Sequence, residues 1–189
     1  MARPLSEAKR QAILASATRL VAAMGIGAPT AKIAQGAEIA EGTLFKYFAN
    51  KDELLNQLYL TLKTELGGTI MQGFLPDASI RERAWHIWSH WIDWGAKYPV
   101  KRKAMRQLGV SERITPATRQ AGSAAFRDVS AAFEQAHALG PLKDQPMAFL
   151  SASFEALAET TLEFTARDPE RREAYKQAGF QIFWGGLGS

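Results

Sequence analysis

Hydroxyl and ammonium groups gather in one early stretch of this 189-residue chain, with spacing suited to binding a polyanion. The side chains concerned are those of Lys32, Thr43, Lys46, Tyr47 and Lys51. Contacts of this kind with phosphate oxygens fix the register of a protein on a nucleic acid without reading its sequence. Groups suited to catalysis are not found: there is no cysteine, no glycine-rich phosphate loop and no nucleophile paired with a base. We therefore expect no enzymatic activity and no cofactor.

Two short predicted helices must position these groups. Pro29 has a backbone φ close to the helical value and suits the first position of a helix running to about Ala37. A second helix is expected from about Ala40 to Phe48. Apolar residues recur at helical spacing in both, namely Ile33, Ala34 and Ala37 in the first and Leu44, Tyr47 and Phe48 in the second. A short helix, a turn and a second short helix form a helix-turn-helix, whose second helix lies in the DNA major groove.

Nine residues of this stretch are predicted to contact DNA, among them Tyr47, whose ring lies on the apolar face and whose hydroxyl can reach a phosphate. They are Lys32, Ala40, Glu41, Gly42, Thr43, Phe45, Lys46, Tyr47 and Lys51. Gly42 lets the helix start approach a sugar-phosphate backbone without a Cβ collision. Glu41 is unfavourable beside phosphates unless it accepts a hydrogen bond from a cytosine amino group.

The same segment resembles the DNA-binding signature of the TetR family of transcriptional regulators. At the positions of that signature the chain has Ile33, Ala34, Ala37, Glu38, Ile39, Ala40, Gly42, Thr43, Leu44, Phe45, Tyr47, Phe48, Lys51 and Leu54. The resemblance covers roughly the first third of the chain. It implies a three-helix DNA-binding domain and a homodimer formed by the two C-terminal helices as a four-helix bundle.

Two positions depart from that signature. Glu38 stands where the signature has a turn glycine, and a positive φ at a non-glycine residue costs on the order of 1 kcal/mol. Ala40 replaces the serine that often caps the recognition helix, so no side-chain oxygen satisfies its first amides. These departures put DNA affinity in question more than the fold.

Charge is distributed unevenly along the chain. Residues 1–51 contain seven Lys or Arg and three acidic residues, whereas the remainder contains 16 of each. All the excess positive charge thus lies with the predicted DNA-binding segment, where neutralising phosphates would release counterions. We predict a DNA-binding domain over residues 1–51 and an effector-binding and dimerisation domain over residues 52–189.

Periodicity and capping signals predict an all-α chain of about nine helices. Ser6 is the expected N-cap of the first helix, and Gly25 its C-terminal stop. Asn50 with Glu53, and Ser79 with Glu82, have the form of capping boxes. The helix beginning after Asn50 would join the two domains.

Four tryptophans at intervals of three residues, Trp85, Trp88, Trp91 and Trp94, form a wide apolar arc on the next helix. Such an arc is explained either by core packing or by the aromatic wall of a ligand cavity. On the second interpretation, the predicted ligand-binding residues are Trp85, Trp88, Trp91, Met105, Phe126, Met147 and Phe154. Since these groups are apolar, the expected effector is a hydrophobic or aromatic small molecule.

The opposite face of that helix has His86 and His90 at a spacing that can bind a transition metal. Because no third cluster of ligands accompanies them, we expect a solvated face and no metal site. A basic run follows, formed by Lys101, Arg102, Lys103 and Arg106. We expect it to be a solvated or interdomain face, with direct phosphate contact as the alternative.

These patterns favour a homodimeric, ligand-responsive repressor that binds double-stranded, palindromic operator DNA. The alternative is a helical adaptor or ligand-binding protein with a weakened helix-turn-helix. The two C-terminal helices are the expected dimer surface, since Ala152, Ala156 and Ala158 allow close approach. No run approaches the roughly 18 apolar residues of a membrane span. We therefore expect a cytoplasmic protein without a membrane partner.

Overall fold

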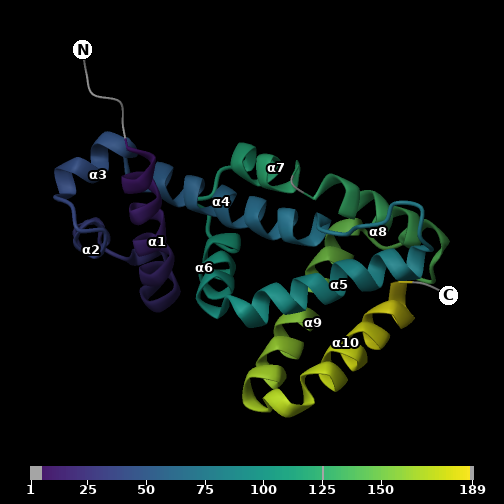
Figure 1. Cartoon of the computed structure of the whole chain (residues 1–189). Coiled ribbons are helices and arrows are strands. Elements are labelled where there is room, and N and C mark those ends of the chain that lie inside the picture. The colour runs from purple at the N-terminus through teal and green to yellow at the C-terminus, as the bar shows by residue number, and fades with distance from the viewer. Residues whose placement is uncertain (1–5, 125, 188–189) are drawn as a thin grey trace. The chain divides into compact units, whose positions relative to one another are not determined.

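The computed structural model describes residues 6–124 and 126–187, and every regular element in this part of the chain is helical (Figure 1). The α-helices are α1 (Glu7–Met24), α2 (Thr30–Gly36), α3 (Glu41–Tyr47), α4 (Lys51–Met71), α5 (Ile80–Lys97), α6 (Pro99–Gly109), α7 (Pro116–Ala124), α8 (Arg127–Leu139), α9 (Met147–Arg167) and α10 (Arg172–Leu187). Short 3-10 turns occupy Gly25–Gly27 and Pro169–Arg171. The all-α prediction is confirmed.

The described chain has ten α-helices where about nine were predicted. The difference arises between Thr115 and His137, where one long helix was expected and two form, α7 and α8. Phe126 caps α8 with a non-helical backbone, φ −117° and ψ 19°. Its ring is buried and packs against Trp91 with ring centroids 6.1 Å apart. The helix thus breaks next to a buried ring, and apolar periodicity alone does not reveal this break.

The chain divides into two compact units. Unit 1 consists of Met1–Glu65 and Tyr98–Ala125, and unit 2 of Leu66–Lys97 and Phe126–Ser189. Helix α4 contributes to both. This division follows packing, whereas the predicted boundary after residue 51 concerns DNA binding and stays a prediction.

Unit 1 is built on α1, which packs against α2 and α6. Its buried face includes Ile13, Leu14, Ala17 and Val21, which recur at helical spacing, whereas Met24 at its end is exposed. Leucines of α4 join this core, with Leu54, Leu55 and Leu58 fully buried. Burial of such side chains contributes about 1.5–3 kcal/mol each, so this core holds α1 to α3 in place.

Unit 2 packs α5 against α8, α9 and α10. Its centre is aromatic, because Trp88 and Trp94 from α5 are almost fully buried. The indole N–H of Trp88 donates to the carbonyl of Lys176 at 2.8 Å, which joins α5 to α10. A buried tryptophan N–H needs such a partner.

The predicted capping signals are confirmed. Ser6 accepts a hydrogen bond from the Lys9 N–H, and Gly25 ends α1 with φ +74°. Asn50 Oδ1 accepts from the Glu53 N–H at 2.9 Å. At the start of α5, the Ser79 N–H donates to the Glu82 carboxylate at 2.9 Å and Ser79 Oγ accepts from the Glu82 N–H at 3.3 Å. These bonds satisfy amides that helix starts leave without partners.

Candidate functional site

The first helix of the helix-turn-helix begins one residue later than expected. Pro29 has a helical φ of −66° but an extended ψ of 135°, so it is the N-cap of α2 and not its first residue. Its carbonyl accepts from the Ile33 N–H at 3.1 Å. The prediction that Pro29 starts the helix is wrong, because proline fixes φ and leaves ψ free.

The turn between α2 and α3 is not adjusted to avoid the left-handed backbone at Glu38. Its φ is +56°, and among the described residues it is the only non-glycine with a positive φ. The turn is held by main-chain hydrogen bonds from Glu38 N–H to Gln35 and from Ile39 N–H to Ala34. The Glu38 side chain is exposed, so the strain lies in the backbone of the turn itself.

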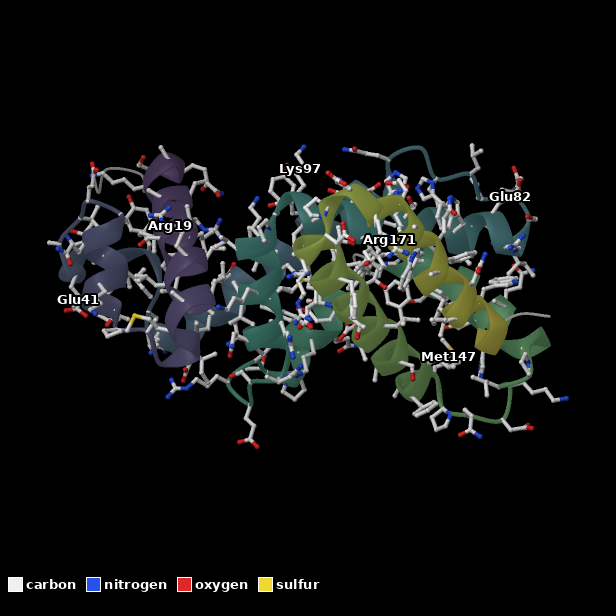
Figure 2. All side chains as sticks on the ribbon, turned by 90° about the horizontal axis from the view of Figure 1, so that it is seen from below. Arg19, Glu41, Glu82, Lys97, Met147 and Arg171 are labelled. Atoms are coloured by element: carbon white, nitrogen blue, oxygen red, sulfur yellow. The ribbon has the colours of Figure 1, made fainter. Side chains whose placement is uncertain are left out.

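A side-chain hydrogen bond ties the start of α3 to α2. Ala40 offers no side-chain hydrogen bond, as predicted. The Glu41 carboxylate instead accepts from the Thr30 hydroxyl at 2.6 Å, which links α3 to the start of α2. Figure 2 shows Glu41 at the outer edge of these helices. One carboxylate oxygen is therefore engaged within the protein.

Helix α3 turns its two faces as expected. Leu44 and Phe48 are buried, whereas Phe45 is 41% exposed. The other predicted DNA-facing residues that are exposed are Lys32, Ala40, Glu41, Gly42 and Lys46, while Thr43, Tyr47 and Lys51 are half-buried. A Cβ added at Gly42 would meet nothing within 4 Å. The surface beside Gly42 is therefore open to a close approach by a ligand.

Tyr47 has a partner that spacing did not reveal. Its hydroxyl accepts from the Ser6 N–H at 3.1 Å, a contact across 41 residues that joins α3 to the start of α1. The hydroxyl can still donate, because it uses only a lone pair in this bond. Tyr47 is thus available to a phosphate oxygen while it holds α1.

Lys51 lies in a more crowded electrostatic setting than predicted. Burial and then the nearby guanidinium of Arg113 lower its pKa below the ordinary lysine value. Arg113 itself pairs with Asp52 at 2.7 Å. The Asn56 amide fixes this loop, since it donates to the Arg113 carbonyl and accepts from the Thr115 N–H. The sequence did not indicate this loop as a support for the start of α4.

Three further residues position α2 and were missed. The Ser16 hydroxyl donates to the Ile33 carbonyl at 2.8 Å, and Arg19 donates to the Gly36 carbonyl at 3.1 Å. A Cβ at Gly36 would stand 2.4 Å from Ser16 Oγ, so this glycine permits α1 and α2 to touch. A signal existed for Ser16, because it is a polar residue one turn after Ile13 on the apolar face of α1.

Four of the predicted ligand-binding residues come together in unit 2. Trp88 contacts Phe154 with ring centroids 5.4 Å apart, and Trp91 contacts both Phe154 and Phe126 at 5.1 and 6.1 Å. Phe133 and Phe183 complete what we call the aromatic cluster, which consists of Trp88, Trp91, Phe126, Phe133, Phe154 and Phe183. The rings meet edge to face in most pairs, a favourable geometry for core packing.

The other three predicted ligand-binding residues lie apart from the aromatic cluster. Trp85 packs against Phe180 of α10, with ring centroids 5.0 Å apart. Met147 is half-buried at the start of α9 (Figure 2). Met105 is buried on α6 and belongs to unit 1. The prediction had grouped these three residues with the other four because all seven side chains are apolar.

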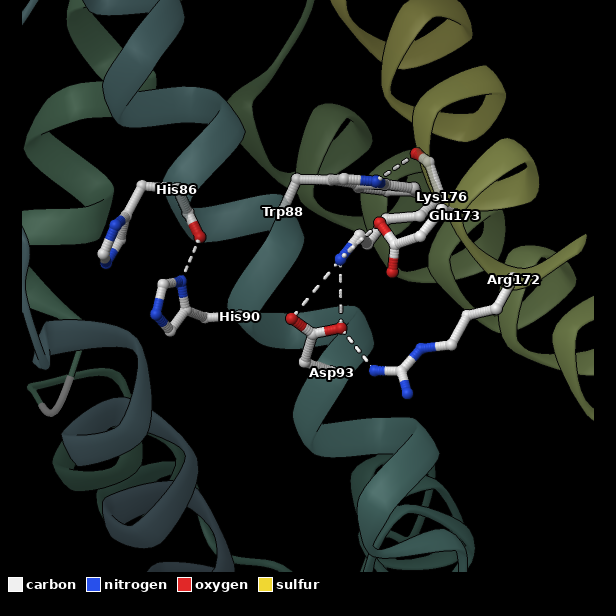
Figure 3. Close-up of polar contacts among 7 residues, drawn as sticks. All are labelled: His86, Trp88, His90, Asp93, Arg172, Glu173 and Lys176. Atoms are coloured by element: carbon white, nitrogen blue, oxygen red, sulfur yellow. Dashed lines mark hydrogen bonds and ion pairs between the residues drawn. The ribbon is translucent and has the colours of Figure 1, made fainter. Parts of the chain in front are cut away.

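The polar face of α5 is not the solvated surface that was expected (Figure 3). His86 shares a hydrogen bond with the Ile70 carbonyl at 2.7 Å and stacks on His90 at 3.9 Å between ring centroids. Asp93 pairs with Arg172 at 2.6 Å and with the buried Lys176 at 3.2 Å. These side chains face the ends of α4 and α10, and this tertiary packing half-buries them. No group of three possible metal ligands occurs in the described residues.

The basic run on α6 is partly used inside unit 1. Lys101 pairs with Glu65 at 2.6 Å and lies 4.7 Å from the ring centre of Tyr98. Lys103 and Arg106 are exposed. In this run Lys101 thus has a structural role, whereas Lys103 and Arg106 are exposed cations.

Helices α9 and α10 expose large apolar side chains. Phe149 and Phe164 on α9 are 55% and 47% exposed, and Ile182 on α10 is 68% exposed. A groove of about 450 Å³ runs between these helices, lined by Leu150, Leu157, Ile182 and Phe183 among others. In the described part of the chain, no helix has the length and apolar character needed to cross a membrane.

The short helix α3 is joined to α2 by a turn and packs on the core of unit 1, with glycine, hydroxyl and lysine groups outward. This arrangement defines a helix-turn-helix DNA-binding protein. Residues 13–58 match the family of bacterial regulatory proteins, tetR family. Beyond these residues, the chain as a whole is similar in fold to solved tetR family transcription regulators.

Solved structures share the fold over nearly the whole chain. A protein of Shewanella sp. PV-4 described as a tetR family transcription regulator is 26% identical, with 96% of this chain and 98% of that chain covered and a TM-score of 0.79. A TetR family regulator from Marinobacter aquaeolei VT8 is 19% identical, with 96% of each chain covered and a TM-score of 0.81. The regulator LfrR from Mycobacterium smegmatis, solved in complex with proflavine, is 17% identical, with coverage of 97% and 99% and a TM-score of 0.67.

Proposed function

We propose that the protein is a homodimeric repressor that binds a palindromic operator through α2 and α3 and leaves it when an apolar or aromatic small molecule binds. The observation that carries the proposal is the outward surface of α3, where open space beside Gly42 adjoins the exposed Lys46. Such a surface suits insertion into a major groove. Its action on DNA places it in the cytoplasm.

The residues of α3 divide between two tasks. Thr43, Lys46 and Tyr47 supply donors for phosphate oxygens and set the position of the helix. Phe45 is exposed and suits contact with a thymine methyl group. Glu41 keeps one oxygen beyond its bond to Thr30 and can accept from a cytosine amino group.

Dimerisation supports the operator symmetry. The exposed apolar residues of α9 and α10 would be buried by a second copy of the same surface, since two-fold interfaces are self-complementary. Two recognition helices about 34–36 Å apart then enter successive major grooves. A palindromic operator follows from that symmetry.

The effector proposal rests on the aromatic character of unit 2. LfrR was solved with proflavine, and it shares the fold of this chain. The aromatic cluster is our candidate for contact with an effector. Release of DNA needs a coupling of only about 1–3 kcal/mol between the two sites. Titration with aromatic compounds should quench tryptophan fluorescence and weaken operator binding in parallel.

The experiment that tests DNA binding is selection from a pool of random duplexes, followed by fluorescence anisotropy with the enriched sequence. We expect a palindromic motif. The double variant Lys46→Glu/Lys51→Glu should weaken binding about 100-fold near 0.1 M salt and lower the salt slope by about two, as for two lost phosphate contacts. The matched control is Arg127→Glu/Lys143→Glu, which reverses two exposed cations outside both the helix-turn-helix and the basic run of α6.

Enrichment of no motif would favour the alternative, a helical adaptor with a weakened helix-turn-helix. Two observations support this alternative, namely the uncapped start of α3 at Ala40 and the positive φ of Glu38. Equal losses in the two double variants would show that overall charge, and not the surface of α3, drives binding.

A further inference from the structure

A second groove lies between the start of α5 and the middle of α10, both in unit 2. Its volume is about 550 Å³, and its lining includes Arg81, Glu82, Trp85, Gln177, Phe180 and Gln181. Small-molecule sites commonly measure about 300–1,000 Å³. We call it the Trp85 groove. It is separate from the aromatic cluster and shares no lining residue with the groove between α9 and α10.

The apolar wall of the Trp85 groove is made of stacked aromatic rings. Trp85 meets Phe180 edge to face at 5.0 Å, and Phe180 stacks on Trp184 at 6.0 Å with 21° between the rings. Phe180 is only 5% exposed and so is fixed by its neighbours, whereas Trp85 is half-buried and retains open surface. A rigid base with one accessible indole suits a planar aromatic partner.

The polar rim of this groove has hydrogen-bonding capacity to spare. The indole N–H of Trp85, the guanidinium of Arg81 and the amides of Gln177 and Gln181 have no hydrogen-bond or ion-pair partner in the described part of the chain. Glu82 is different, since its carboxylate is already bound by the Ser79 hydroxyl and N–H. The rim therefore presents one unpaired positive charge and several donors.

We propose that the Trp85 groove binds a planar aromatic carboxylate. The ring lies against Trp85 and Phe180, and the carboxylate takes the guanidinium of Arg81, which can bind both of its oxygens. The two glutamines hydrogen-bond substituents at the ring edge. A carboxylate fits better than a cation because the Arg81 guanidinium has no partner, whereas the Glu82 carboxylate already accepts two hydrogen bonds from Ser79. This site is independent of the DNA-binding proposal.

The test is isothermal titration calorimetry of the full chain with 2-naphthoate, a probe that has one fused ring system and one carboxylate. Its neutral and cationic analogues, 2-naphthylmethanol and 2-naphthylmethylammonium, control for the charge. We expect one molecule per chain, with 2-naphthoate bound more tightly than either analogue. Trp85→Leu should weaken it by about tenfold, the loss expected for an aromatic contact. Arg81→Gln should weaken it about threefold to fivefold, as for an exposed ion pair.

The matched control is Arg127→Gln, which removes an exposed arginine of the same unit outside the groove. It should leave the affinity unchanged. Circular dichroism checks that each variant folds, and Trp85→Phe keeps a ring if Trp85→Leu does not fold. Absence of binding, equal affinity for the three probes, or affinity unaffected by both Trp85 variants and Arg81→Gln would overturn the proposal. None of these results would bear on DNA binding, which is measured separately.

Discussion

The helix-turn-helix and the tryptophan arc of α5 were both predicted from regularly spaced residues, but the spacing determines different things in the two regions. On α3, the spacing placed Leu44 inside and Lys46 outside, and the structure agrees. On α5, the spacing placed tryptophans on one arc without indicating whether they surround a space or fill it. The structure buries Trp88 completely against the rings of Phe154 and Phe183. An outward surface follows from one helix, whereas a cavity depends on how several helices fill the volume between them.

Loss of a ring from the aromatic cluster should produce the largest change. Phe154 is 5% exposed and touches Trp88, Trp91, Phe133 and Phe183. If the cluster is core, Phe154→Ala should lower the free energy of unfolding by about 3–5 kcal/mol, measured by urea denaturation. Phe45→Ala, at an exposed ring on α3, is the control and should cost less than about 1 kcal/mol. Similar losses for the two variants would mean that the cluster leaves room for a ligand.

Two glycines of the helix-turn-helix sharpen the comparison between packing and an open surface. Gly36→Ala places a Cβ 2.4 Å from Ser16 Oγ and disturbs the buried bond to Ile33, so it should destabilise the fold by about 1–3 kcal/mol.

Gly42→Ala meets no atom in the free protein. It should raise stability by up to about 1 kcal/mol while lowering DNA affinity. Thermal unfolding and anisotropy measure the two effects, and unchanged DNA affinity in Gly42→Ala would contradict a close backbone approach there.

The strained backbone of the turn at Glu38 should make a smaller contribution to folding stability. Its φ of +56° is unfavourable for a residue with a Cβ, so Glu38→Gly should relieve strain of on the order of 1 kcal/mol. Glycine's greater conformational freedom in the unfolded chain offsets part of this relief. We therefore expect the free energy of unfolding to rise by about 0.5 kcal/mol. Glu112→Gly, an exposed residue without a positive φ, should lose stability instead. A loss in both variants would show that the Glu38 side chain has a stabilising role.

The capping box of α5 should give the smallest effect, and it depends on pH. Hydrogen bonds from the Ser79 hydroxyl and N–H lower the pKa of Glu82 below its ordinary value of 4.5. Because the folded-state pKa is the lower one, the stabilisation is present above pH 4.5 and is lost as pH falls through the folded value. Glu82→Gln keeps a capping group without the charge. The melting temperatures of the two proteins should therefore differ at pH 7 and converge in acid, whereas a constant difference would contradict the assignment.

The sequence by itself determined features that depend on residues within about one helical turn. The caps at Ser6, Asn50 and Ser79 are of this kind. The faces of α3 follow as well, since periodicity sets which side chains point together. The matching signature over residues 13–58 extends this to the whole helix-turn-helix.

Only the tertiary structure decided the contacts that join residues far apart in the chain. Tyr47 meets Ser6 across 41 residues, and Lys176 meets Asp93 across 83. The break between α7 and α8 and the separation of Trp85 from the aromatic cluster belong here too. Periodicity gives the direction of a side chain from its own helix axis, but not which helix lies opposite or how far away. Those distances come from packing all the side chains of a unit at once.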